Sequence, residues 1–395
     1  MLDFSLSPDQ QAWKDKARGA LEHLAPRFAG PLSSQDRRAL ADEAWQSLAA
    51  AGFFGAIVPR ELGGSDEGLL PMCFAQEELA ALGGGNNLTV LTTVATLAIA
   101  TGGLEKTAQR FLPQIASGRA KFCLAVTEPE AGFNTLAIKT FARRGENSYT
   151  IDGSKIYISG ADVADWMLLL ARTKSLDDCA KEKLPKSHGL SAFVVDPRAP
   201  GIEKRPIRAQ GDGGLVPFEL TFNRVEVPLE NRIGPEHLAA LGLFAAFNAE
   251  RILFSCSAVG MSRYCLDRAC RHARERSVFK GPIGAYQSIQ HPLAEVQIRQ
   301  EAVRLAAYRA AWCFEQGVDP TEVSIHANSA KLLASELATL AVDAAINALG
   351  GKGFDEDFGI IQLLAQARLM KTSPISNALV LNAIAERVLE LPRSY

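Results

Sequence analysis

The sequence predicts an α+β protein in which a helical N-terminal domain, a middle β domain and a C-terminal helical bundle follow one another. Apolar residues recur at helical spacing over the first 120 residues. From about residue 121 to 234 the period shortens to two, in runs rich in Val, Ile, Tyr and Thr. The helical spacing then returns and lasts to the end. Because this period separates helices from strands, we expect domains at 1–120, 121–234 and 235–395.

The composition is that of an ordinary soluble globular protein, with 47% hydrophobic and 22% charged residues. Forty-two Lys and Arg residues against 44 Asp and Glu residues give a net charge of −2. This balance favours neither nucleic acid nor an anionic membrane as a partner. No uninterrupted apolar run approaches the roughly 20 residues of a membrane span. The N-terminus carries Asp3 and no basic segment, so we expect no signal peptide.

The seven cysteines and six histidines are scattered along the chain, and no Cys-x-x-Cys pair occurs. Zinc sites and disulfide frameworks both need such side chains at regular spacing. We therefore expect no metal site, free thiols and a cytoplasmic location.

The N-terminal segment has helix start and stop signals. Ser7-Pro8-Asp9-Gln10 combines a capping side chain with proline in the first turn. Further helices are predicted at about 36–51, 71–82 and 88–101. The triple glycine Gly83–Gly85 lacks the preceding strand and the lysine of a phosphate-binding loop, so we interpret it as a connector.

The middle segment predicts an antiparallel β-barrel or sandwich. Asp152-Gly153 is typical of a hairpin turn, and Ser175–His188 is expected to be a charged surface loop. The predicted strands are 122–127, 148–151, 156–159, 167–171, 190–195 and 218–222.

The last segment predicts a four-helix bundle, because its helices are long and their connections short. Gly350-Gly351 suits the C-terminus of the third helix. No Gly-x-Gly-x-x-Gly follows a predicted strand, which argues against a Rossmann nicotinamide site. The predicted helices are 236–278, 286–317, 322–349 and 376–390.

One glutamate lies on the apolar face of the first of these helices, in the stretch 241–260. Glu250 shares that face with Leu243, Phe247, Phe254 and Ser257, at alternating steps of four and three. A carboxylate there loses hydration and is suited to accept a proton near neutral pH. From this stretch alone, a structural glutamate paired with Arg251 or with another helix is the simpler interpretation.

Four motifs in order add a resemblance to a known family. They are Ala125-Val126-Thr127-Glu128-Pro129-Glu130-Ala131-Gly132, then Gly153-Ser154-Lys155-Ile156-Tyr157-Ile158-Ser159, then the segment from Arg274 through Gln287 to Leu293-Ala294-Glu295, and Leu349-Gly350-Gly351-Lys352-Gly353-Phe354. Together they resemble the acyl-CoA dehydrogenase family over essentially the whole chain.

The resemblance implies FAD as cofactor, an acyl-CoA substrate and a role in fatty acid and lipid metabolism. It also implies electron-transfer flavoprotein as the acceptor, and a homotetramer built as a dimer of dimers or a heterotetramer.

The resemblance also implies which residues bind the flavin. Thr127 and nearby backbone amides would hydrogen-bond the ring, Tyr157 would pack on it, and Ser159 would lie near its N5 atom. Arg276 and Gln287 match positions that reach the FAD of the neighbouring subunit, where the arginine fork suits a pyrophosphate. The full expected set is Ala125, Val126, Thr127, Tyr157, Ile158, Ser159, Arg276, Phe279, Gln287, Asn347, Gly350 and Gly351.

The base departs from the commonest family pattern. Many members carry a glutamate where this chain has Asn377, and asparagine cannot act as a base. The isovaleryl-CoA and long-chain branches use the glutamate of a Glu-Arg pair on the long helix, which here is Glu250-Arg251. We therefore predict Glu250 as the base. Phe133, Asn248, Arg251 and Asn377 are the expected substrate contacts, with the Asn377 N–H available to a thioester carbonyl.

Other departures keep two alternatives open. Phe133-Asn134 replaces a usual Ser-Asp, Asn347 replaces a common glutamine, and Leu379 replaces a threonine that usually contacts FAD. Each change removes or shortens a polar contact. The alternatives are a weakly active or non-catalytic partner subunit of a heteromeric dehydrogenase, and a flavin oxidase or monooxygenase on the same fold.

Overall fold

The computed structural model describes residues 4–28, 30, 32–85, 87–102, 104–211 and 213–393. Asp3, on which the expectation about a signal peptide rests, lies outside these residues. The chain forms two compact units, each assembled from separate segments. We call Met1–Phe53, Glu67–Asn86 and Arg251–Tyr395 the bundle unit, and Phe54–Asp66 with Asn87–Glu250 the sheet unit.

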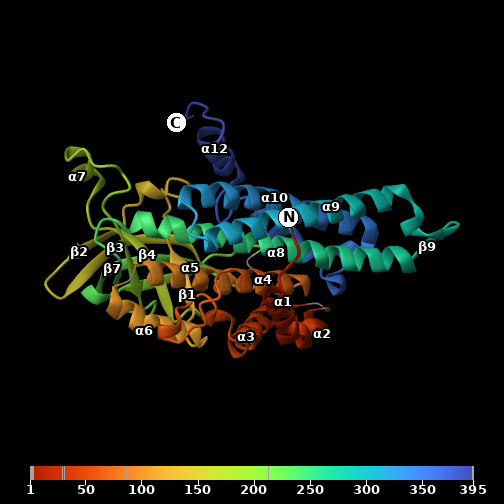
Figure 1. Ribbon diagram of the computed structural model, residues 1–395, viewed down its shortest axis with the longest axis horizontal. Coiled ribbons are helices and arrows are strands. Elements are labelled where there is room, and N and C mark those ends of the chain that lie inside the picture. Colours follow the sequence, from red (N-terminus) through yellow and green to blue (C-terminus); the bar gives the residue numbers. More distant parts are fainter. Residues whose placement is uncertain are drawn as a thin grey trace. The chain divides into compact units, whose positions relative to one another are not determined.

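The bundle unit is helical, and its longest elements are α8, α9 and α10 (Figure 1). Ser7 caps the first helix through a reciprocal bond pair with Gln10, as the sequence predicts. The third long helix begins at Pro320 after the cap Asp319 and ends at Gly350, whose φ is +59°. The helices are α1 Pro8–Leu21, α2 Ala25–Phe28, α3 Ser34–Ala50, α4 Leu70–Ala81, α8 Ala239–Glu275, α9 Gln287–Glu315, α10 Pro320–Leu349, α11 Ile361–Leu369 and α12 Asn377–Arg387.

The sheet unit holds an eight-stranded sheet in the order β6-β7-β3-β2-β4-β5-β8, with β1 also paired to β4. Its helices are α5 Asn87–Gly102, α6 Glu105–Ala116 and α7 Leu176–Lys181. Most pairs are antiparallel, but β1 and β2 both run parallel to β4. The sheet is therefore mixed rather than purely antiparallel. The strands are β1 Phe122–Ala125, β2 Phe141–Arg144, β3 Ser148–Ser159, β4 Trp166–Arg172, β5 Leu190–Val195, β6 Ile202–Pro206, β7 Pro217–Pro228 and β8 Arg232–Ile233.

The hairpin predicted at Asp152-Gly153 is wrong. Strand β3 continues through both residues, and its register with β7 shifts between Ile151 and Gly153. A Cβ at Gly153 would lie only 2.6 Å from Thr140 Oγ1. The glycine therefore marks a β-bulge where neighbouring backbone comes close. In the sequence, a glycine at a bulge cannot be told from a glycine at a turn.

The helical stretch Pro320–Phe354, made of α10 and the 3₁₀ turn that follows it, is long and apolar enough by composition to cross a bilayer. However, 56% of its most apolar window is buried, and α10 packs against α9, α11 and α12. Leu337, Ala341 and Ala345 of this helix belong to the core of the bundle unit. Its apolar residues are therefore accounted for by packing within the bundle.

Helix α8 supplies core residues to both units. Leu243 and Ala246 join the core of the sheet unit, together with residues of α5, α6 and the strands. Ala258, Cys265 and Ala269 join the core of the bundle unit. The boundary between the units falls after Glu250, inside one continuous helix of 37 residues.

A cluster of charges is buried where α4 packs within the bundle unit. Glu77 on α4 has no exposed surface, and Gly260 of α8 lies so close that an added Cβ would be 2.2 Å from the Glu77 carbonyl oxygen. Burial alone would raise the pKa of Glu77, but its partners hold that pKa below the usual value. The partners of its carboxylate are Lys14 Nζ at 3.3 Å, Arg263 Nη1 at 3.1 Å, Arg304 Nε at 3.2 Å and Tyr308 Oη at 2.6 Å.

Replacing Glu77 with glutamine should lower the free energy of unfolding by about 3–5 kcal/mol, because buried cations lose their counter-ion. Glu301→Gln is the matched control. Glu301 also pairs with Arg304, but its side chain is 52% exposed, so its loss should cost about 1 kcal/mol or less. Urea denaturation at neutral pH measures both. Equal losses in the two variants would show that burial of the Glu77 cluster contributes nothing.

Candidate active site

Two neighbouring segments of the sheet unit carry hydroxyl groups. Thr127 follows β1, Ser159 ends β3, and both side chains are half-buried. The Ile156 N–H donates to the Thr127 carbonyl oxygen at 2.9 Å, which ties the first segment to β3. Within the described chain, neither hydroxyl has a hydrogen-bond partner. Both hydroxyls are therefore available to a ligand.

Tyr157, two residues before Ser159, is an exposed aromatic residue of β3. Its φ is +59°, and the register of β3 shifts between Lys155 and Ile158. A bulky residue in the left-handed region is strained, and such strain gathers at functional sites. The bulge turns Lys155 inward and leaves Tyr157 62% exposed. An exposed aromatic ring held this way can pack against a flat ligand.

A buried ion pair fixes these segments to each other. Lys155, with no exposed surface, donates to Glu128 Oε1 at 2.9 Å and to the Val126 carbonyl oxygen at 2.8 Å. Glu128 also accepts the backbone N–H groups of Lys139 at 2.6 Å and Thr140 at 2.9 Å. Burial lowers the pKa of Lys155 to about 8, and Glu128 opposes that shift. Sequence analysis missed this role, for which the signal was a lysine inside a predicted strand motif.

The remaining expected flavin residues lie in the bundle unit. A short hairpin, β9 Ser277–Val278 with β10 Gly281–Pro282, joins α8 to α9 (Figure 1). Phe279 at its tip is 95% exposed, with φ of +58°. Arg276, Gln287, Asn347, Gly350 and Gly351 are also exposed. These residues belong to a different compact unit from Thr127, Tyr157 and Ser159.

Glu250 lies on a half-buried strip of α8. Phe247, Glu250, Phe254 and Ser257 are all half-buried, whereas the neighbouring Leu253 is buried. Four of the five residues on the predicted face are therefore partly accessible, whereas the fifth, Leu243, is buried in the core of the sheet unit. The adjacent Arg251 donates through Nη1 to Asn328 Oδ1 of α10 at 2.8 Å.

Asn377 begins α12, and all of its polar groups are engaged. Lys331 Nζ donates to its Oδ1 at 2.9 Å and to the Ile375 carbonyl oxygen, and Nδ2 donates to Ser335 Oγ at 3.0 Å. The Asn377 N–H donates to the Lys371 carbonyl oxygen at 3.0 Å. The expectation that this N–H is free for a thioester carbonyl is therefore wrong, because the turn before α12 already uses it.

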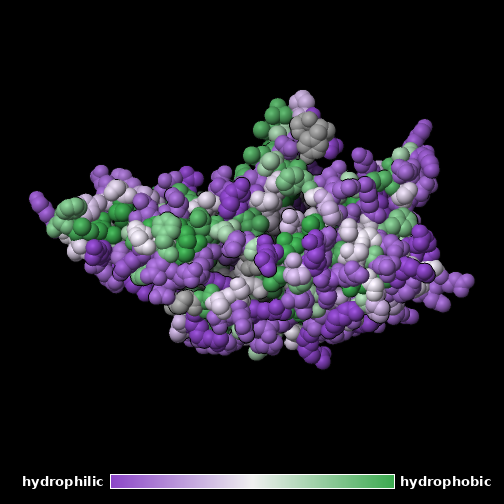
Figure 2. All heavy atoms as spheres, turned by 180° about the vertical axis from the view of Figure 1, so that it is seen from behind, coloured by the Kyte–Doolittle hydropathy of each residue, from purple (hydrophilic) through white to green (hydrophobic). Residues whose placement is uncertain are grey.

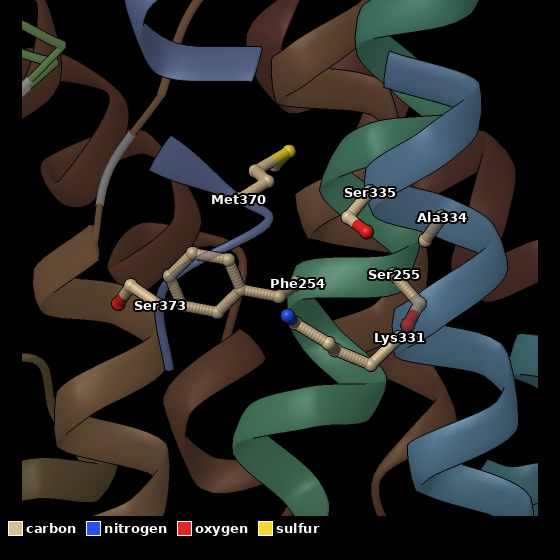
Figure 3. A pocket seen from close by; sticks show the side chains of 7 residues that line it. All are labelled: Phe254, Ser255, Lys331, Ala334, Ser335, Met370 and Ser373. Atoms are coloured by element: carbon tan, nitrogen blue, oxygen red, sulfur yellow. The ribbon is translucent and has the colours of Figure 1, made fainter. Parts of the chain in front are cut away.

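Lys331 lines a small cavity in the bundle unit (Figure 3). The ring of Phe254 points from α8 toward the segment that carries Met370 and Ser373. The cavity volume is about 10 Å³, roughly the space that one water molecule needs. Lys331 is 2% exposed, and among the described residues no carboxylate lies within ion-pair distance of it. The sequence signal for Lys331 was that it is the one Lys or Arg residue of α10. Ser255, Ala334 and Ser335 complete the lining.

Two expected substrate contacts differ in exposure. Phe133 is 67% exposed, in the segment after the Thr-Glu-Pro motif. Asn248 is buried, on a different side of α8 from the accessible strip. Of these two residues, Phe133 is open to a ligand and Asn248 is not.

Family models match three consecutive stretches of the chain. They are the acyl-CoA dehydrogenase N-terminal domain over residues 7–119, its middle domain over 123–225 and its C-terminal domain over 243–389. The chain belongs to the acyl-CoA dehydrogenase family. It is accordingly an oxidoreductase that acts on acyl-CoA and depends on FAD, and the free hydroxyls beside Tyr157 fit that cofactor.

Individual relatives agree with this assignment. The acyl-CoA dehydrogenase FadE12 of Mycobacterium tuberculosis is 36% identical over 354 residues, which cover 89% of each chain. The solved glutaryl-coenzyme A dehydrogenase in complex with glutaryl-CoA has a TM-score of 0.89 at 27% identity, covering 100% of this chain and 98% of that one. A chain in the structure of the electron transferring flavoprotein of Acidaminococcus fermentans has a TM-score of 0.88 at 27% identity, covering 98% and 100%.

Replacing Lys155 with methionine should lower the free energy of unfolding by about 3 kcal/mol, because Glu128 stays buried without its counter-ion. Glu128→Gln should cost a similar amount. The double variant removes both charges and should be more stable than either single variant. It should nevertheless hold less FAD per chain, because the ion pair that fixes the two segments to each other is gone. Thermal unfolding and flavin-to-protein absorbance measure these effects. A double variant as unstable as the sum of the singles would contradict the pairing.

The stability of the dehydrogenase should rise with pH because of Lys331. Burial, and then the charge of Arg251, lower the pKa of Lys331 to about 8 from 10.5. A folded-state pKa below the unfolded one means that the unfolded chain binds more protons between these values, so stability increases as pH rises through them. The unfolding temperature of Lys331→Met should not rise in this way with pH. If the unfolding temperatures of the wild type and the variant change in parallel with pH, the lowered pKa of Lys331 is refuted.

Proposed function

We propose that this dehydrogenase oxidises an acyl-CoA thioester between its α and β carbons to the trans-enoyl-CoA, with Glu250 removing the α-proton. The observation that carries the proposal is a half-buried carboxylate on an accessible, mainly apolar strip of α8. The side chain of Asn377, where many relatives have the base, is an amide held by Lys331 and Ser335. Of these two candidate positions, only 250 carries a carboxylate.

An apolar strip suits a base for a thioester. The α-proton is weakly acidic, so its removal needs a base held in place and shielded from water. Phe247 and Phe254 flank Glu250 on the same face and would exclude water once an acyl chain covers them. Phe133 is proposed as a further contact of the acyl-CoA, while Asn248, Arg251 and Asn377 would support the site from α8 and α12.

The sheet unit is proposed to hold the flavin ring. When bound, FAD accepts the β-hydrogen of the substrate as a hydride. Thr127 and Ser159 would donate hydrogen bonds to the ring, Tyr157 would pack against it, and Ala125, Val126 and Ile158 would contribute backbone groups. Hydroxyl donors at that place favour the negative charge of a reduced ring. The free hydroxyls and the strained, exposed Tyr157 support this arrangement.

We propose a homotetramer whose subunits share their flavin sites. Arg276, Phe279 and Gln287 are exposed and would reach the FAD of a neighbouring copy, with Asn347, Gly350 and Gly351 beside them. Exposed apolar side chains support association. Ile298, Leu305 and Trp312 recur every seven residues on α9, and Leu381 and Val388 are exposed on or just after α12. Figure 2 shows hydrophobic residues on the segment that carries α12, at the top of the view.

The electron acceptor is proposed to be an electron-transfer flavoprotein. The enzyme is further proposed to act in fatty acid metabolism, in the cytoplasm. The similarity to a chain in the structure of such a flavoprotein supports the first proposal. The seven cysteines, all free and mostly buried, are consistent with a reducing compartment such as the cytoplasm.

Glu250→Gln should slow substrate-dependent flavin reduction by about 10²–10⁴-fold, the range that a positioned general base supplies. Anaerobic bleaching of the flavin by a panel of acyl-CoAs measures this rate. Asp267→Asn is the matched control, because Asp267 is an exposed acid on the same helix, and it should react at the wild-type rate. Wild-type bleaching by Glu250→Gln would rule out Glu250 as the base.

A further inference from the structure

Gln76 of α4 is a buried amide with one unsatisfied end. It is 2% exposed, and Ser257 Oγ donates to its Oε1 at 3.2 Å. Its Nε2 has no hydrogen-bond partner among the residues that the structure describes. If the amide were turned over, Nε2 would meet Ser257 Oγ and Oε1 would be left without a partner. One polar end of Gln76 therefore lacks a partner in either orientation. Buried polar groups are normally paired, so the unpaired end of Gln76 can take a hydrogen-bond partner from a bound molecule.

The partner of Gln76 lies on the strip of α8 that carries Glu250. Ser257 follows Glu250 by seven residues and Phe254 by three, which keeps all three on one face. Seven residues advance about 10 Å along the helix axis. Beyond Ser257 the strip is closed within the bundle unit, because an added Cβ at Gly260 would touch the backbone of α4. Gln76 and Ser257 therefore lie at the closed end of the strip.

The chemistry of this end is polar but uncharged. The acids that follow Gln76 are already matched by cations, since Glu77 meets Lys14 and Arg304 and Glu78 meets Arg263. The amide and the hydroxyl offer both donors and acceptors without net charge. Such a pair suits a neutral hydroxyl or carbonyl, whereas a carboxylate would lose hydration without gaining a counter-ion.

We propose that Gln76 and Ser257 form a polar subsite that selects acyl-CoA substrates whose chain carries a neutral hydrogen-bonding group, such as a hydroxyl, at its far end. The proposal rests on the role proposed for Glu250, because that residue fixes where the reacting carbons lie. Phe254, between the two ends, would contact the apolar middle of the chain.

Pairs of substrates test the subsite directly. Octanoyl-CoA and decanoyl-CoA are compared with their ω-hydroxy derivatives in anaerobic flavin bleaching by the wild-type protein. At the chain length that reaches Gln76, the hydroxylated substrate should half-saturate at a concentration about five-fold to ten-fold lower than its parent, as for one buried hydrogen bond.

Gln76→Leu keeps the volume of the side chain and removes its polar end. The ratio of the half-saturating concentrations of the parent and the hydroxylated substrate should therefore fall to about one. Gln300→Leu is the matched control. Gln300 of α9 is also buried, and its Oε1 accepts from Ser262 Oγ at 2.8 Å, away from the strip. This control should keep the wild-type preference, and unfolding temperatures of both variants show that they fold.

The outcomes separate the two proposals. Bleaching by the parent acyl-CoAs without a preference for any hydroxylated chain would refute the subsite and leave the dehydrogenase function standing. The subsite is likewise refuted if Gln76→Leu keeps the wild-type preference. If no acyl-CoA bleaches the flavin, the proposed function fails, and the subsite fails with it.

Discussion

The continuity of α8 is the constraint on which the rest of this dehydrogenase depends. Its first turns complete the core of the sheet unit, and its later turns complete the core of the bundle unit. Glu250 is the last residue of the first group. A helix holds its side chains at fixed angles about one axis. Packing in both cores therefore fixes the direction in which the Cα–Cβ bond of Glu250 points, which contributes to the positional control that a general base requires.

Buried charge is handled in different ways across the molecule. Glu77 and the pair Lys155–Glu128 are matched by opposite charges and hydrogen bonds, which makes them supports of the fold. The buried Lys331 ammonium donates its hydrogen bonds to uncharged oxygen atoms, and the side-chain amide of Gln76 has a partner for only one of its two ends. Both incompletely matched groups lie on or next to residues of the Glu250 strip. Natural proteins concentrate such local deficits at functional sites, where a ligand can complete them.

Much of the fold could be predicted from local patterns, because helix period and capping are properties of neighbouring residues. The start of α1 at Ser7 and Pro8 and the end of α10 at Gly350 follow from their own sequence. The predicted hairpin at Asp152-Gly153 failed because a glycine serves a turn and a bulge equally well. The parallel pairing of β1 and β2 with β4 could not be predicted, since it depends on which distant strands meet.

The sequence by itself determined the order of helical and β segments, the family, and the candidate base at Glu250, because each is carried by a local motif or period. Only the tertiary structure decided which polar groups meet. Lys331 reaches Asn377 across 46 residues, and Lys155 reaches Glu128 across 27. A hydrogen bond demands atoms within a few ångströms and aligned. Such contacts are set by how elements pack, which no local pattern of residues records.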